Sequence, residues 1–157
     1  GNRHRIQQQV KMLVDAEAPI SKNLLYKKIL QAWNTTRTGA RLEAYLQEII
    51  NETCVNTTLH HQPFYWNNRD RTIDYYPDNS IEKRRIEDIA PEEIAVAIQE
   101  AVEHNPSIEE EELIRYLCRV FGFAKVGKQI DSLLRYAIDE AERGGTIKRD
   151  GGRVKIG

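Results

Sequence analysis

The sequence contains an internal repeat, because a shift of 88 positions aligns its first part with its last part without a gap. Some of the aligned residues are identical, as where Leu25 meets Leu113, and others keep their character, as where Trp33 meets Phe121. Nearly all of these matches fall on apolar positions at helical spacing, where a shared core requires them. The chain therefore reads as two copies of one small fold.

Each copy carries the pattern of three amphipathic helices. Apolar residues at helical spacing predict a first helix over residues 6–16, whose partner in the second copy starts at Pro91. The second helix has apolar residues every four positions, and Ser21 is its expected N-cap in the first copy. A tight turn then leads into the third helix, which opens at Gly39 or Gly127. Short turns of this kind are typical of helix-turn-helix units.

Two strands are expected after the third helix of each copy. In the first copy they occupy residues 53–59 and 63–67, across a turn of two histidines and a glutamine. In the second copy they occupy residues 146–149 and 153–156, around Asp150-Gly151-Gly152. Asp-Gly is a strong hairpin signal because both residues tolerate a positive φ. A brief extended stretch is also expected before the second helix of each copy.

Three helices followed by a hairpin is the element order of a winged helix. We therefore predict a mainly helical α+β chain of two tandem winged helix-turn-helix modules, at residues 1–67 and 91–157. The intervening residues 68–90 are polar and charged, with Ile73, Tyr75 and Tyr76 as the apolar cluster that we identify. We expect this segment to be an extended linker.

Composition and cysteine usage indicate the cellular compartment in which we expect the chain. The runs of apolar residues are too short to cross a bilayer, and the N-terminal residues lack the apolar core of a secretory signal. Cys54 and Cys118 are far apart and belong to no zinc-binding spacing, which favours a reducing compartment. We expect a cytoplasmic protein without a membrane partner. Because the chain opens with Gly1, we also expect it to be a fragment of a longer protein.

Catalytic signatures are missing from the sequence. It has no phosphate-binding loop with a lysine, no paired acid–base carboxylates and no nucleophile motif, so we expect no catalytic site, cofactor or metal. His60 and His61 are expected in an exposed turn, and the glutamates of 109–112 at a solvated helix start. Gly39 and Gly127 leave two interpretations open: backbone approach to a phosphate, or a close helix crossing or turn that forbids a side chain.

Several stretches of the sequence resemble the sequence pattern of a known protein family. These are RTGARL at 37–42, FGFAKVGKQI at 121–130, DGGRVKI at 150–156 and, most specific, RRIEDIAPEEI at 84–94. They resemble the domain of unknown function near the C-terminal end of large bacterial helicase-like proteins of superfamily I. The resemblance implies a parent chain with helicase-type motors that act on nucleic acid. The family's second basic residue after the glycine is kept as Arg41 but replaced by Gln129 in the second copy.

Charge placement predicts how such a chain meets nucleic acid. Residues 1–66 carry a net charge of +3, residues 67–90 carry −1 and residues 91–157 carry −3, so any binding of DNA should be weak and salt-dependent. Basic residues nevertheless gather where a winged helix meets a duplex, at the start of the third helix and on the hairpin. The predicted nucleic-acid-binding residues are Arg37, Thr38, Arg41, Lys125, Lys128, Lys148, Arg149, Arg153 and Lys155.

Two alternatives remain open at the level of the sequence. The near-neutral charge and the aromatic trio Phe64-Tyr65-Trp66 would suit a protein-interaction or docking module, or self-association, if the trio is exposed. The trio could equally pack against the core of its own module. A catalytic pocket at the junction of the two modules, gathering Tyr75 and Tyr76, is the third hypothesis.

Overall fold

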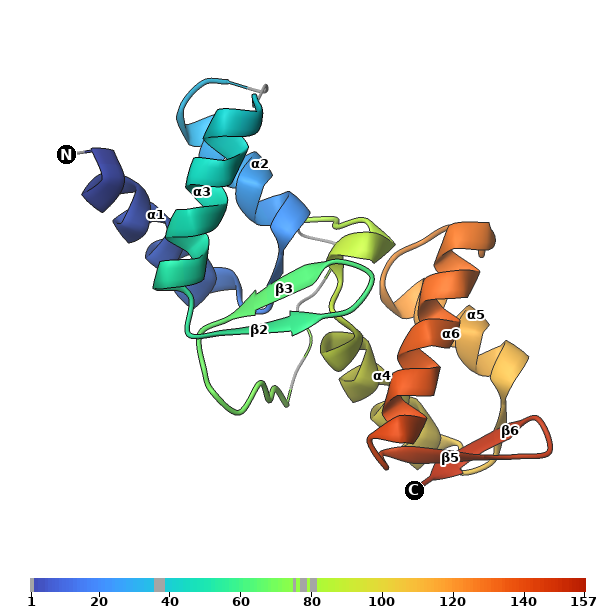
Figure 1. Ribbon diagram of the computed structural model, residues 1–157. Helices are drawn as coiled ribbons and strands as arrows, with labels where there is room; N and C mark the ends of the chain where they lie inside the picture. The colour runs from blue at the N-terminus through green and yellow to red at the C-terminus, as the bar shows by residue number, and fades with distance from the viewer. Residues whose placement is uncertain (1, 36–38, 75, 77–78, 80–81) are drawn as a thin grey trace. The chain divides into compact units, whose positions relative to one another are not determined.

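The computed structural model describes residues 2–35, 39–74, 76, 79 and 82–157. The chain is α+β and mainly helical, and it divides into two compact units, Gly1–Arg71 and Thr72–Gly157 (Figure 1). Within the described residues each unit holds three α-helices and one three-stranded antiparallel sheet.

The first unit follows the order helix, strand, helix, helix, strand, strand. Its elements are α1 (Asn2–Glu17), β1 (Ile20–Ser21), α2 (Lys22–Ala32), α3 (Ala40–Thr53), β2 (Asn56–Leu59) and β3 (Pro63–Trp66). The short strand β1 pairs with β3, which gives the strand order β1-β3-β2. The brief extended stretch expected before the second helix is thus confirmed as a strand.

Apolar stripes build the core of the first unit. α1 buries Ile6, Val10 and Val14 against the inner faces of the other two helices. Ser21 caps α2 as predicted, because its hydroxyl oxygen accepts a hydrogen bond from the backbone N–H of Leu24 at 3.0 Å. The sequence pattern thus correctly predicted the buried face of α1 and the residue at which α2 starts.

The second unit repeats this order after a short 3-10 helix. Its elements are η1 (Ile86–Asp88), α4 (Pro91–His104), β4 (Ile108–Glu109), α5 (Glu110–Val120), α6 (Lys128–Arg143), β5 (Ile147–Asp150) and β6 (Arg153–Ile156). The strand order β4-β6-β5 matches that of the first sheet. β4 and α5 lie 88 positions after β1 and α2 at both ends, so the elements keep the offset of the sequence repeat.

The end of the segment 68–90 departs from an extended linker. Ile86 and Ile89 are buried in the second core, and η1 contacts α6. The sequence analysis had placed the apolar cluster of this segment at residues 73–76 and had missed these two isoleucines. Two isoleucines three positions apart, one within the helical turn of η1 and the other directly after it, can face the same core.

Both hairpins form, with small shifts from the expected bounds. In the second unit Asp150 pairs with Arg153, so the turn consists of Gly151 and Gly152, with φ values of 58° and 80°. Glycine suits both positions because a positive φ costs it no steric penalty. In the first unit α3 continues to Thr53, which delays the first strand.

Candidate nucleic-acid interface

The starts of α3 and α6 share an unusual arrangement. Gly39 and Gly127 are the N-caps, and among the described residues no side chain caps either helix start. Their φ values are −86° and −88°, and a Cβ built at either position would meet no atom of the described residues within 4 Å. The interpretation that a close crossing forbids a side chain here is therefore wrong. What remains is an open helix start whose backbone N–H groups a ligand can approach.

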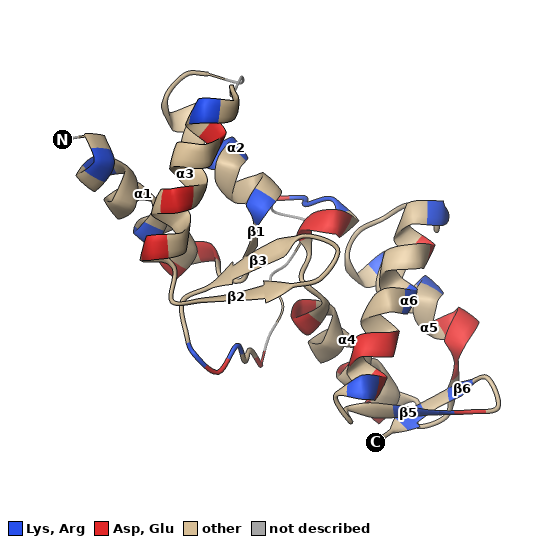
Figure 2. Ribbon diagram, in the orientation of Figure 1, with Lys and Arg blue, Asp and Glu red and all other residues tan. Residues whose placement is uncertain are grey.

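Basic side chains flank these two helix starts. Arg41 lies in the first turn of α3, Lys128 is the first residue of α6, and Lys125 lies just before it; Figure 2 shows blue at both helix starts. All three are exposed, and none forms an ion pair with a residue that the structure describes. Arg37 and Thr38, the other two residues predicted for this position, lie outside the described residues. The described cations are free to meet a phosphate.

Arg149, on the second hairpin, forms ion pairs within its own unit. Its guanidinium lies 2.5 Å from Glu110, 2.7 Å from Asp139 and 2.9 Å from Glu142. Partial burial opposes the charge of Arg149, but hydrogen bonds to these three carboxylates outweigh it and raise the pKa of the guanidinium. Its positive charge is thus offset within the unit, so this residue is a poor candidate for a phosphate contact.

The other basic residues of the second hairpin divide into paired and unpaired. Arg153 lies 3.4 Å from Glu109, and Lys155 lies 3.0 Å from Asp150. Ion pairs this exposed contribute little, and a phosphate can compete for their cations. Lys148 is exposed and forms no ion pair within the described part of the chain. Of the predicted hairpin residues, Lys148 is the most available.

Arg135 was missed by the sequence analysis. It lies on α6 and pairs with Glu110 at 2.8 Å, Glu111 at 2.7 Å and Asp131 at 3.0 Å. Hydrogen bonds to Asp131 and Glu111 raise the pKa of its guanidinium. Part of the glutamate run expected to be solvated is therefore engaged: Glu110 joins Arg135 of α6 to Arg149 of the hairpin.

The first unit has a neutral cluster at the equivalent place. Gln47 lies 88 positions before Arg135 and accepts a hydrogen bond from the Tyr26 hydroxyl at 2.7 Å. Its amide nitrogen donates to the Tyr65 hydroxyl at 3.1 Å and to Asn51 at 2.8 Å. Burial raises the pKa of Tyr26 to about 12, so the donating phenol stays protonated across the neutral range. The repeat offset pairs Gln47 with Arg135, but it does not relate the partners of the two residues.

The first hairpin offers neither lysine nor arginine between Asn56 and Trp66. All three members of the aromatic trio are buried, and Tyr65 packs in the first core. The Trp66 indole donates a hydrogen bond to the Thr58 hydroxyl at 2.9 Å. The expectation of an exposed aromatic docking patch is therefore wrong, and the core-packing interpretation holds for Tyr65.

Other predicted features can be placed more briefly. His61 is exposed at the first hairpin turn and His60 is half-buried, and both rings lie edge-on to Phe64. Tyr76 packs against Phe121, whereas Tyr75 lies outside the described residues. Over the described ranges, no histidine, cysteine or carboxylate group gathers in a way that could hold a metal ion. None of the helices described there combines the length and apolar character needed to cross a membrane.

Comparison with known proteins matches only the beginning of the chain. A family model described as "Protein of unknown function (DUF3320)" matches residues 1–44, which cover α1, α2 and the first residues of α3. Searches of curated proteins and of solved structures found no match. The chain is thus similar to that family over its first two helices and the start of the third.

Proposed function

We propose that both units are winged helices and that the chain binds duplex DNA through phosphate contacts at the starts of α3 and α6. The contacts carry no strong sequence preference. In this proposal the chain is a non-catalytic accessory part of a longer, cytoplasmic, helicase-like protein. The order of elements in each unit and the sequence resemblance to helicase-associated domains support it.

The observation that carries the proposal is the pair of uncapped, open helix starts with unpaired cations beside them. The first N–H groups of a helix have no partner within it, and the helix dipole favours an anion there. At the starts of α3 and α6 no side chain in the described part of the chain supplies a cap, and the N-cap glycines leave room for a phosphate oxygen to approach. The same arrangement occurs in both units, which argues for a shared use.

We give the predicted residues different roles according to whether the structure shows them in ion pairs. Arg41, Lys125 and Lys128 contact phosphates, and Lys148 adds a contact from the second hairpin. Arg149 holds the hairpin against α5 and α6 through its carboxylate partners and does not contact DNA. With only four contacts, binding is weak, and the logarithm of the affinity falls with the logarithm of salt concentration with a slope of about −3.6.

The test uses fluorescence anisotropy of labelled duplex and single-stranded DNA against the full chain. The decisive variant is Gly39→Asp with Gly127→Asp, because an aspartate N-cap stabilises a helix but repels a phosphate. We expect the thermal midpoint to be kept or raised while affinity falls about tenfold. Arg41→Ala with Lys128→Ala should weaken binding to a similar degree.

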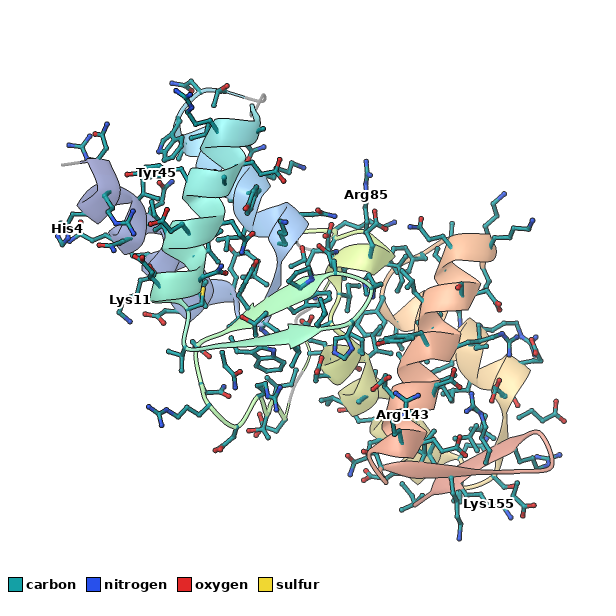
Figure 3. The ribbon with its side chains drawn as sticks, viewed as in Figure 1. His4, Lys11, Tyr45, Arg85, Arg143 and Lys155 are labelled. Carbon is teal, nitrogen blue, oxygen red and sulfur yellow. The ribbon has the colours of Figure 1, made fainter. Side chains whose placement is uncertain are left out.

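The matched control is Lys11→Ala with Arg143→Ala, which lowers the net charge by the same amount and also changes one site in each unit. Lys11 lies on α1, and Arg143 ends α6, at the opposite end from Lys128 (Figure 3). Binding of this control should stay within about twofold of the parent chain, because bulk charge matters less than position. Absence of binding at low salt, or equal loss in the control and the aspartate variant, overturns the proposal.

A further inference from the structure

An open groove crosses the outer face of the first unit. Its volume is about 710 Å³, and a neighbouring hollow of about 410 Å³ shares Arg5 and Trp33 with it. Tyr45 lines the hollow from α3 and extends toward α1, where Arg3 lies over its ring at 5.9 Å (Figure 3). Among the residues that line the groove are Arg5 and Met12 of α1, and Trp33 at the end of α2.

The equivalent face of the second unit is covered by its own chain at the position of Trp33 but not along its whole length. Farther along, Ala101, His104 and Tyr116, the counterparts of Leu13, Ala16 and Lys28, line an open hollow of about 370 Å³. Phe121, which occupies the position of Trp33, is fully buried, and the Tyr76 ring lies 5.4 Å from it. The side-chain amide of Asn79 donates a hydrogen bond to the Phe121 carbonyl at 2.8 Å. Ile86 and Ile89 are buried in the same hydrophobic cluster as Phe121. We call residues 76–90, as far as the structure describes them, the covering segment.

One position on this face carries opposite charges in the two units. In the second unit Glu93 is buried and pairs at 3.0 Å with Arg84 of the covering segment. In the first unit the equivalent residue is Arg5, which is exposed and forms no ion pair with any residue the structure describes. An occupant that repeats the cover would therefore need a carboxylate where the covering segment has Arg84.

A second pair of equivalent positions further defines the chemistry of the segment that would bind in the groove. Glu100 of the second unit accepts a hydrogen bond from the Tyr76 hydroxyl at 3.0 Å. Its counterpart in the first unit is Met12, whose side chain is 71% exposed and offers an apolar surface instead. The occupant of the first groove should therefore present an apolar side chain, rather than a tyrosine hydroxyl, at this point.

We infer that the groove of the first unit binds a peptide segment that packs an apolar side chain on Trp33 and Met12 and places a carboxylate opposite Arg5. The segment binds as the covering segment does in the second unit, with the charge reversed. The covering segment of another copy is a poor occupant, because its Arg84 would face Arg5. This interface is separate from the proposed DNA contacts, since Arg41 does not line the groove.

The experiment titrates the full chain into two fluorescein-labelled peptides with the sequence of residues 76–90. Both peptides carry Tyr76→Phe, which removes the hydroxyl that bonds to Glu100 in the second unit, and one of them also carries Arg84→Glu. We expect the glutamate peptide to bind about tenfold more tightly, because its carboxylate meets Arg5. Arg5→Glu in the chain should reverse that preference, and Trp33→Ala should weaken binding of the glutamate peptide about tenfold.

Lys27→Glu is the matched control, because Lys27 is exposed on α2 and does not line the groove. It should leave the preference for the glutamate peptide unchanged. The inference is overturned if neither peptide binds, if both bind equally, or if Arg5→Glu fails to reverse the preference. It is also overturned if sedimentation shows that the chain forms dimers that Trp33→Ala abolishes, because a second copy would then occupy the groove. The DNA titration is independent of all these outcomes.

Discussion

The two units join their second helix, third helix and hairpin with different chemistry, although both use the same position of the third helix, Gln47 or Arg135. The first unit uses the neutral cluster around Gln47, which bonds Tyr26 and Tyr65. The second unit uses Arg135 and Arg149, which share Glu110. The backbone plan therefore does not require one kind of side-chain contact. In the second unit these ion pairs engage Arg149, one of the basic residues that its sequence offered to DNA.

The outer faces differ as well. The second unit buries Phe121 beneath its covering segment, whereas the first leaves Trp33 half-buried beside an open groove. A residue at the same repeat position thus belongs to a closed core in one unit and to a surface in the other. Substitutions at paired positions test how far this difference reaches.

The largest effect is expected at the covered aromatic position. Phe121→Ala should lower the free energy of unfolding of the second unit by about 3–5 kcal/mol, because it leaves a cavity in a closed core. Trp33→Ala should cost the first unit less than about 2 kcal/mol, since part of that ring already meets solvent. Hydrogen exchange read by mass spectrometry would assign each loss to its unit. Equal losses would contradict the difference between the two faces.

An intermediate effect is expected at the junctions. Arg149→Ala removes the shared partner of three carboxylates and should destabilise the second unit by about 2 kcal/mol, whereas Gln47→Ala should cost the first about 1 kcal/mol. Raising NaCl from about 0.05 M to about 1 M should reduce the loss of stability caused by Arg149→Ala and leave that caused by Gln47→Ala unchanged, because salt screens only charges. Denaturant titrations at both salt concentrations would measure this. A salt-independent Arg149→Ala effect would show that packing, not charge, holds the hairpin.

The smallest effect is expected where each second helix ends. Asn34 and Gly122 are equivalent in the repeat, and both have positive φ, at 55° and 80°. Asn34→Gly should stabilise the first unit by about 0.5 kcal/mol, and Gly122→Asn should destabilise the second by a similar amount, because glycine adopts this conformation without strain. Thermal unfolding of the two variants would measure the pair. Shifts of the same sign would mean that the two turns are not equivalent.

The repeat and the apolar spacing were enough to predict most of the fold. They located the helices, the Ser21 cap and the second hairpin, because each depends on local pattern. The packing of Ile86 and Ile89 into the second core was missed, since a three-residue helical turn leaves too short a pattern to distinguish from a linker. Contacts that join distant parts of a chain leave no such local trace.

The candidate site was predictable only in part. The sequence located basic residues near each third helix, but it could not show which of them already have partners. Arg149 illustrates this, because Glu110, Asp139 and Glu142 come from two other elements. Conversely, the open space around Gly39 and Gly127 is visible only in three dimensions. Pairing and open space, rather than residue type, decide which cations can reach a phosphate.

The covering segment also has a consequence for the order of events during synthesis. A growing chain leaves the ribosome from its N-terminus, so Tyr76 and Asn79 emerge before Phe121 and before α6, which η1 contacts. The segment must therefore wait, with its apolar side chains unburied, until the helices that receive it have been translated. The first unit, whose described core lies entirely upstream, can finish folding while the second is still being made.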